Sequence, residues 1–415
     1  MNQPLHFDTR AIHEGIKDHD WEGATLPPIF QTAAHFHDTA ADLGQTFAGE
    51  RSDHIYMRLT NPTNRFLEEK LASLESGQAA VVTASGMAAI SNACMTLLRA
   101  GDEFVASSSL FMSTYALFTN IFKKYGITVR LADPLNLEDM AAQITDKTRF
   151  IYMETITNPG MEIPDLRQVA NLAHENGIPL MVDNTLASPW LCRPIELGAD
   201  IVVHSTTKYF SGHGAALGGV VVDAGNFDWH TDRFADFAPF VAQKGNLAFL
   251  HRLFKEHHVN FGTTAAPFHS FLTVLGLSTM GVRMERHMTN TVQAATFLRK
   301  HPKVTWVNFV GFPDHPCHEM AKKQFGDKGF GTMLTFGLAD QDACFRLVDH
   351  LSMILNLANL GDCKTLIIHP YSSQYVSFPR ELKDRLADPC LLRFSVGIEH
   401  IDDICGDLAA ALETV

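Results

Sequence analysis

Two residues of complementary chemistry, Asp183 and Lys208, follow neighbouring apolar runs of the sequence. Asp183 closes the run Ile178-Pro-Leu-Met-Val, and Lys208 comes shortly after Asp200-Ile-Val-Val-His. A lysine in an apolar site can lose its proton and form an imine with an aldehyde, and a carboxylate opposite a pyridine nitrogen keeps that nitrogen protonated. Taken alone, an Asp is more often a helix cap and a Lys a surface charge, so the pair needs support from other residues.

Groups suited to binding a phosphate occur in three segments. Ser205 and Thr207 stand on the same short segment as Lys208, and Ser85-Gly86-Met87 opens a predicted helix. Free backbone N–H groups and the dipole at a helix start favour a dianion, although a Ser-Gly start is more often an ordinary cap. Tyr56-Met-Arg58 adds a phenol and a guanidinium that would suit a phosphate clamp, although such an arginine is usually solvated.

The elements that would position these residues alternate between helix and strand from about residue 66. Helical spacing at 66–75 precedes a strand-like run at 79–83, and further apolar runs cover 104–107, 149–154, 178–183 and 200–205. Apolar strands that alternate with helices indicate a parallel sheet in an α/β domain. Ligands of such sheets bind beyond the carboxyl ends of the strands, which is where Glu154, Asp183 and Ser205 would meet.

The rest of the chain is predicted to form an arm and a second domain. Residues 1–65 are rich in polar residues, Pro and Gly, which predicts an extended arm that reaches a neighbouring subunit. The α/β domain would occupy 66–255. Residues 256–415 combine a long helical stretch at 268–299 with strand-like runs at 304–307 and 333–337, a helix near 341–354 and a last helix from about 401, which predicts a smaller α+β domain.

Composition narrows the class of protein. The 415 residues are 46% hydrophobic and 19% charged, which is enough apolar material for two domains. A net charge of −13 with scattered basic residues argues against nucleic acid or a membrane surface as a partner. Seven widely spaced cysteines without a Cys-x-x-Cys pair argue against disulfides and structural zinc, so we expect no metal and, without a visible export segment, a cytoplasmic protein.

Together the motifs resemble those of one family. Ser205-x-Thr207-Lys208-Tyr-Phe-Ser-Gly-His-Gly, preceded by Val182-Asp183-Asn-Thr, is similar to the signature of the cystathionine γ-synthase-like, Cys/Met-metabolism group of fold-type I pyridoxal-phosphate enzymes. The family's other blocks are matched in order along essentially the whole chain by Tyr56-x-Arg58-x-x-Asn61-Pro-Thr63, Ser85-Gly-Met87, Glu154-Thr-x-x-Asn158-Pro and Arg393-Phe-Ser-Val-Gly-Ile-Glu. The resemblance implies pyridoxal 5′-phosphate as cofactor and an aminotransferase-like fold with a mainly parallel seven-stranded sheet.

The resemblance also implies a role for each residue. Lys208 would bind the cofactor as a Schiff base and then shuttle protons, and Asp183 would pair with the ring nitrogen. Arg393 would bind the substrate α-carboxylate through a two-pronged ion pair, with Asn158 assisting. Glu154 would lie near the ring, unless it is a strand-end charge in solvent. The cofactor phosphate would be held by Ser85, Gly86, Met87, Ser205 and Thr207, joined by Tyr56 and Arg58 from a neighbouring subunit of a homotetramer.

Two positions narrow the reaction. Where the family usually stacks a Tyr on the cofactor ring, this chain has Phe111, which can stack but cannot exchange a proton. An activated ester departs as a stable carboxylate and needs less acid help than a thiol. Asn359 resembles the O-acetylhomoserine sulfhydrylase branch, because the γ-lyase and cystathionine γ-synthase branches usually carry Ser there, and it would belong to the substrate site. We therefore expect γ-replacement of O-acetyl-L-homoserine by sulfide or a thiol, giving L-homocysteine or L-methionine and acetate.

Several alternatives stay open at this point. Within the family they are cystathionine γ-synthase activity and γ-lyase activity on cystathionine or methionine. The sulfur donor could be sulfide, methanethiol or a sulfur-carrier protein with a C-terminal thiocarboxylate. Outside the family, a nucleotide-binding dehydrogenase would use the glycines of Gly212-x-Gly214-x-x-x-Gly218, but their spacing is not that of the dinucleotide-binding motif. A zinc hydrolase is suggested by Asp314-His-Pro-Cys317-His318-Glu, but the sequence has no His-Glu-x-x-His motif and no second pair of ligands at zinc-finger spacing. The histidines at 251, 257 and 258 are predicted to form a solvated helix face.

Overall fold

This computed structural model describes residues 5–415, and its largest element is a seven-stranded sheet. In order across the sheet, the strands are β1 (Ala79–Thr83), β7 (Gly219–Asp223), β6 (Ile201–His204), β5 (Leu180–Asp183), β4 (Thr148–Glu154), β2 (Glu103–Ser107) and β3 (Thr128–Ala132). Strand β7 is antiparallel to both of its neighbours, and the other neighbouring pairs are parallel. The predicted mainly parallel seven-stranded sheet is therefore confirmed.

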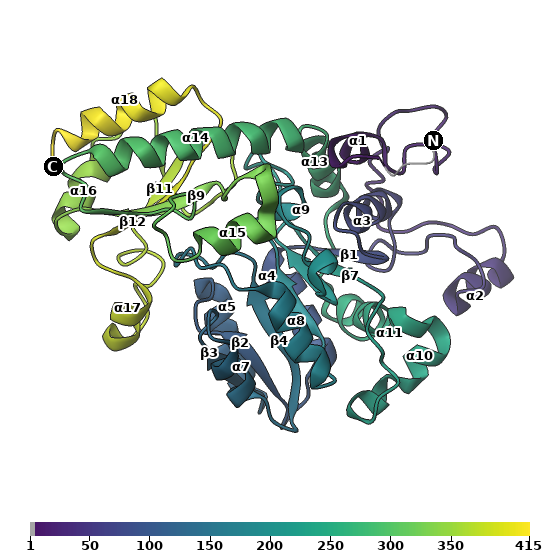
Figure 1. Cartoon of the computed structure of the whole chain (residues 1–415). Coiled ribbons are helices and arrows are strands. Elements are labelled where there is room, and N and C mark those ends of the chain that lie inside the picture. Colours follow the sequence, from purple (N-terminus) through teal and green to yellow (C-terminus); the bar gives the residue numbers. More distant parts are fainter. Residues whose placement is uncertain (1–4) are drawn as a thin grey trace.

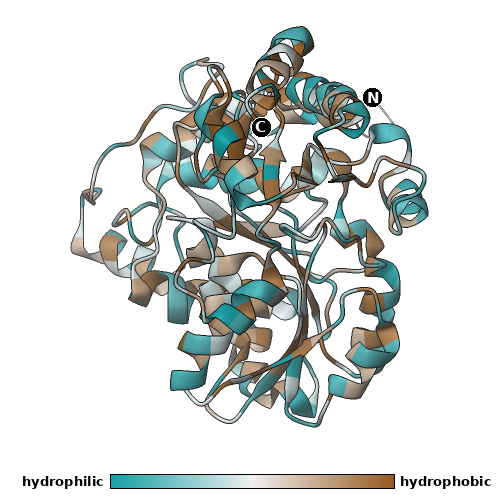
Figure 2. Cartoon of the chain, turned by 90° about the vertical axis from the view of Figure 1, so that its left-hand side faces the viewer, coloured by the Kyte–Doolittle hydropathy of each residue, from teal (hydrophilic) through white to brown (hydrophobic). Residues whose placement is uncertain are grey.

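Both faces of this sheet are buried. Successive residues of a strand point to opposite sides of the sheet, so each strand contributes to two apolar clusters. Val182 and Val202 join one apolar cluster, whereas Met181 and Val203 join a second one. Hydrophobic strands accordingly run through the centre of this layer and hydrophilic residues lie on the outer helices (Figure 2). The helices of this part are α3 (Pro62–Leu74), α4 (Gly86–Leu97), α5 (Met112–Ala116), α6 (Phe122–Lys124), α7 (Leu137–Gln143), α8 (Leu166–Glu175), α9 (Ser188–Leu191), α10 (Ala238–Lys244), α11 (Ala248–Arg252) and α12 (Val259–Phe261).

A second, smaller sheet follows in the C-terminal part of the chain. Its order is β10 (Leu355–Asn356), β11 (Leu366–Ile368), β12 (Leu391–Ser395), β9 (Met333–Gly337) and β8 (Trp306–Asn308). Its helices are α15 (His318–Phe325), α16 (Gln341–Asp349), α17 (Arg380–Leu386) and α18 (Ile401–Leu412). Figure 1 shows this part above the large sheet, joined to it by α13 (Pro267–Leu277) and α14 (Met280–Lys300). The helical stretch expected at 268–299 is thus two helices that break at Ser278 and Thr279.

One edge of the large sheet is closed by side chains and loops. Strand β1 is the outermost strand, and its Val82 N–H donates to the Glu68 carboxylate on α3 at 3.0 Å. Just beyond the strand, the Ala84 N–H donates to the carbonyl of Thr263 at 2.8 Å. These backbone groups therefore have partners, and an isolated bridge between Thr83 and Thr264 adds to the cover of this edge.

The N-terminal segment differs from a purely extended arm. It contains α1 (Phe7–His13), which buries Phe7 and Ala11 in the core, and α2 (Ala40–Ala48). The buried Lys70 donates to the carbonyl of Ala11 at 2.9 Å and so holds the end of α1. Beyond α1 the segment is mostly exposed, with Phe36 at 91%. The expectation of an arm outside the core is therefore wrong for α1, whose apolar face was too short to be detected as periodic.

The expectation of a solvated histidine face is wrong for His258. A π-helical turn at Leu253–His258 rotates this side chain inward, where it is buried. Burial lowers the pKa of His258 to about 4, so it is neutral at physiological pH. His251 and His257 are partly exposed.

Candidate active site

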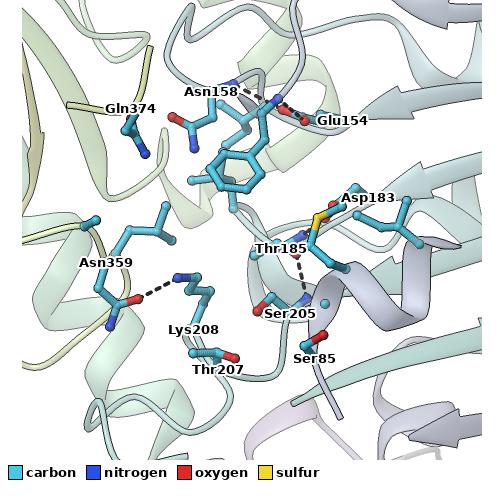
Figure 3. A pocket seen from close by; sticks show the side chains of 18 of the residues that line it. Ser85, Glu154, Asn158, Asp183, Thr185, Ser205, Thr207, Lys208, Asn359 and Gln374 are labelled. Carbon is cyan, nitrogen blue, oxygen red and sulfur yellow. Dashed lines mark hydrogen bonds between the residues drawn. The ribbon is translucent and has the colours of Figure 1, made fainter. Parts of the chain in front are cut away.

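A cavity lies at the carboxyl ends of β4, β5 and β6, between the large sheet and segments of the C-terminal part (Figure 3). Its volume is about 200 Å³. Most residues predicted to act together line it, although they come from seven separate segments. They are Ser85, Gly86, Met87, Phe111, Glu154, Asn158, Asp183, Ser205, Thr207, Lys208, Asn359 and Arg393. The sheet topology thus brings together the residues that the sequence separates.

Asp183 ends β5 and opens onto this cavity. One of its carboxylate oxygens accepts from the Thr185 N–H at 2.9 Å, and the other accepts from the Tyr152 hydroxyl at 3.3 Å. Burial raises the pKa of Asp183 above its ordinary value, and the bonds from Thr185 and Tyr152 oppose that effect. A protonated ring nitrogen in the cavity would compensate the charge of this carboxylate.

Glu154 lies directly opposite Asp183 in the register of β4 and β5. It is only 4% exposed, so it is not a strand-end charge in solvent. Its carboxylate accepts from the Phe111 N–H at 2.7 Å and from the Asn158 N–H at 3.2 Å. Burial, followed by the neighbouring Asp183, raises the pKa of Glu154 well above its usual range. Glu154 therefore connects two loops that carry other lining residues.

The start of α4 has the form of an anion site. Ser85 caps the helix by accepting from the Ala88 N–H at 3.1 Å, which leaves the N–H groups of Gly86 and Met87 at the first turn for a ligand. A Cβ atom at Gly86 would lie 2.7 Å from the Cβ of Ser205, so only glycine allows this close approach. Thr207 faces the same side of the cavity (Figure 3).

Lys208 reaches the cavity from the turn after β6. Its Nζ donates to the side-chain oxygen of Asn359 at 2.6 Å (Figure 3). Burial, with a smaller contribution from the charge of Arg393, lowers the pKa of Lys208 to about 8. An appreciable fraction of this amine is therefore neutral and nucleophilic near neutral pH.

Arg393 on β12 is a buried cation whose partners in the structure are neutral. It is 2% exposed and donates to the side-chain oxygens of Asn158 at 3.3 Å and Gln374 at 3.4 Å, and to the backbone carbonyl of Asn359 at 3.2 Å. Burial lowers its pKa to about 10. A buried guanidinium held at such long distances by amides is suited to receive a carboxylate.

These groups fit pyridoxal phosphate. The cavity offers a helix start with hydroxyls for a dianion, a neutral amine for an aldehyde and a carboxylate that burial makes costly without a cationic partner. Phe111 offers an aromatic face beside them. The arrangement can therefore hold a phosphorylated pyridine aldehyde next to an amino acid whose carboxylate meets Arg393.

Tyr56 and Arg58 do not line the cavity of their own chain. Tyr56 is 44% exposed, and the Arg58 guanidinium donates to the carbonyl of Val259 at 2.7 Å and lies 5.5 Å from the centre of the Tyr56 ring. Their predicted contact with phosphate would need a second subunit, so it stays a prediction.

Three residues near the cavity were missed in the sequence. Thr185 joins two parts of the site, because its N–H bonds to Asp183 and its hydroxyl accepts from the Ser205 N–H at 2.9 Å. Gln374 contacts Arg393, and Tyr152 contacts Asp183. Thr185 follows Asp183 by two residues and could have been found as a turn residue, whereas nothing in the local sequence marks the other two.

Residues 5–415 include no group of three or more His, Cys, Asp or Glu side chains arranged to bind a metal. Across the same residues, every helix is too short or too polar to traverse a lipid bilayer.

Comparison with known proteins agrees with this geometry. The family model described as Cys/Met metabolism PLP-dependent enzyme matches residues 8–413. A homocysteine synthase of Schizosaccharomyces pombe is 39% identical over 98% of this chain and 98% of its own. An L-methionine gamma-lyase of Porphyromonas gingivalis is also 39% identical, over 99% of this chain and 97% of its own.

A solved structure extends the likeness to three dimensions. It is that of a putative O-acetylhomoserine (thiol)-lyase of Campylobacter jejuni, with an N′-pyridoxyl-lysine-5′-monophosphate residue. Its sequence is 32% identical to this chain, and the two structures superpose with a TM-score of 0.94 over 99% of this chain and 100% of the other. The predicted fold-type I architecture is thereby confirmed.

Proposed function

This chain belongs to the Cys/Met-metabolism family of pyridoxal-phosphate-dependent enzymes, and from that premise we propose that it replaces the acetoxy group of O-acetyl-L-homoserine with sulfide. The Cγ–O bond breaks and a Cγ–S bond forms, so that hydrogen sulfide and the ester give L-homocysteine and acetic acid. The observation that carries the proposal is that Asn359 joins the two key cations. Its side-chain oxygen accepts from Lys208, and its backbone carbonyl accepts from the buried Arg393. Among chains of this family, the 39% identity to a homocysteine synthase supports the same reaction.

The cofactor would be held by residues on the large-sheet side of the cavity. Lys208 would bind its aldehyde carbon, Asp183 its ring nitrogen and the start of α4 with Ser205 and Thr207 its phosphate. When bound, pyridoxal phosphate withdraws electrons from the substrate and makes the hydrogens on Cα, and then on Cβ, acidic. Phe111 would stack on the ring and limit the access of water.

The chain's own residues would then position the substrate and move protons. Arg393 and Asn158 would bind the α-carboxylate, which fixes the direction of the four-carbon chain. The Lys208 amine would remove a proton from Cα and then one from Cβ, and it would return protons to the same atoms after sulfide has added to Cγ. Asn359 would keep this amine inside the cavity by accepting its hydrogen bond.

Phe111 favours a substrate with a good leaving group. Its ring has no proton to donate, and acetate needs little protonation as it leaves. A γ-lyase or cystathionine γ-synthase activity, which expels or accepts a thiol, is the second candidate, and the 39% identity to a methionine gamma-lyase favours it. We place γ-lyase activity second because its thiolate leaving group would call for an acid at the position of Phe111. Cystathionine γ-synthase activity also expels a carboxylate, and we place it second because that branch usually carries Ser where this chain has Asn359.

The remaining partners are also proposals. Methanethiol would give L-methionine directly, and a carrier protein with a C-terminal thiocarboxylate is a further donor. A homotetramer in the cytoplasm, in which Tyr56 and Arg58 of one subunit reach the phosphate of another, is consistent with the exposure of both residues on a single chain.

A substrate panel tests the proposal. The purified enzyme is offered O-acetylhomoserine, O-succinylhomoserine, O-phosphohomoserine, cystathionine and methionine, with and without sulfide, and homocysteine and 2-oxobutanoate are measured. We expect homocysteine from O-acetylhomoserine with sulfide to be the dominant product. Dominant 2-oxobutanoate from cystathionine or methionine would reject the sulfhydrylase assignment.

A further inference from the structure

Tyr152 places a phenol behind the carboxylate of Asp183. Its hydroxyl donates to Oδ2 of Asp183 at 3.3 Å. The contact follows from the strand register: Glu154 pairs with Asp183, and Tyr152 lies two residues earlier on β4, so both side chains project from the same face toward Asp183. Strand β4 therefore flanks this carboxylate with a hydrogen-bond donor on one side and a second acid on the other.

The surroundings of Asp183 make that donor important. The other carboxylate oxygen is occupied by the Thr185 N–H at 2.9 Å, and burial raises the pKa of Asp183, which makes its charged form costly. A carboxylate withdrawn from water needs donors that offset its lost hydration. Tyr152 supplies such a donor from the neighbouring strand β4.

The Tyr152 side chain is also held firmly in place. It is 0% exposed, and its ring packs edge-on against Phe118 with 5.0 Å between ring centres. Burial, followed by the charge of Asp183, raises the pKa of Tyr152 well above its ordinary value. The phenol therefore remains protonated and can act toward Asp183 only as a donor.

We propose that Tyr152 is a positioning residue, which fixes the orientation of Asp183 and stabilises its charge so that this carboxylate can pair with a protonated pyridine nitrogen. Tyr152 does not touch the cavity and acts through Asp183. The inference rests on the proposed function, in which Asp183 receives the ring nitrogen of the cofactor.

A double-mutant cycle tests the inference. Apo-protein of the parent, Tyr152→Phe, Asp183→Asn and the double variant is titrated with pyridoxal phosphate, and the dissociation constant is measured by absorbance. We expect Tyr152→Phe to weaken binding about three- to tenfold, as for the loss of one ordinary intramolecular hydrogen bond, because the bond to Asp183 is long at 3.3 Å. Asp183→Asn should weaken binding more, and the double variant should lie within about twofold of Asp183→Asn, because Tyr152 then has no charge to stabilise.

Two controls separate this role from general packing. Tyr209→Phe removes another buried phenol, whose hydroxyl contacts Thr332 rather than Asp183, and should leave the dissociation constant within about twofold of the parent. The visible circular dichroism of the bound cofactor should change in Tyr152→Phe and not in Tyr209→Phe. Thermal unfolding of each apo-protein checks folding, and Tyr152→Leu, which also lacks the hydroxyl and adds no bulk at this buried position, replaces Tyr152→Phe if that variant is unstable.

The outcomes are distinct. Unchanged cofactor affinity in Tyr152→Phe, or losses that simply add in the double variant, would overturn the role of Tyr152. If Asp183→Asn itself binds the cofactor like the parent, the assignment of Asp183 to the ring nitrogen fails instead.

Discussion

The two walls of the cavity are built in different ways. On the large-sheet wall, backbone N–H groups at strand ends and turns hold Glu154, Asp183 and Thr185 at 2.7 to 2.9 Å in their shortest bonds. On the opposite wall, Arg393 makes side-chain bonds of 3.2 to 3.4 Å to neutral groups. The first wall is organised before any ligand arrives. The second keeps a strong cation available, so that substrate provides its best partner.

Lys208 stands between the walls, and its removal should have the largest effect. Lys208→Ala eliminates both the proposed attachment point and the base, so we expect kcat for homocysteine formation to fall by at least about 10⁴-fold. Reduction with borohydride followed by peptide mass analysis should locate the cofactor on Lys208 in the parent. Lys70→Met, which removes a buried lysine outside the cavity, is the matched control for attachment. A Lys208→Ala enzyme that kept more than a small fraction of its rate would contradict the assignment.

Arg393→Lys should separate the two walls. A lysine cannot make the two-pronged ion pair, so we expect KM for O-acetylhomoserine to rise about 100-fold. Cofactor affinity, which depends on the other wall, should stay within about twofold of the parent. Steady-state kinetics and a cofactor titration measure the two quantities. Equal losses in both would show that the walls are not independent.

Phe111→Tyr should have the smallest effect. The added hydroxyl can protonate a departing thiolate, so we expect 2-oxobutanoate formation from cystathionine to rise a few-fold. Homocysteine formation from O-acetylhomoserine should change by less than about twofold, because acetate needs little acid help. Phe111→Leu, which removes the ring, controls for stacking. Unchanged lyase rates in Phe111→Tyr would mean that another group already protonates the leaving atom.

The same contrast explains how much could be predicted from the sequence. Lys208, Asp183 and Ser205 follow apolar strands, and parallel strands bring their carboxyl ends to one edge, so their meeting was predictable. Arg393 and Asn359 were placed through the resemblance alone, since nothing in local patterning indicates where the second sheet docks. The buried His258 and helix α1 escaped because a π-helical turn and a seven-residue helix carry little periodic signal.

Contacts that depend on register between distant segments could not be predicted. Tyr152 meets Asp183 only because Glu154 pairs with Asp183, and a shift of one residue would turn Tyr152 to the other face. Gln374 reaches Arg393 from an irregular segment whose conformation no periodicity describes.

The contact between Glu68 and Val82 bears on whether other chains can pair with the outermost strand of the large sheet. An uncovered outer strand is a template on which strands of other molecules can assemble into aggregates. By accepting the outward N–H of Val82, the Glu68 carboxylate occupies a position that an incoming strand would need. This bond therefore works against strand-to-strand association of copies of this chain along β1.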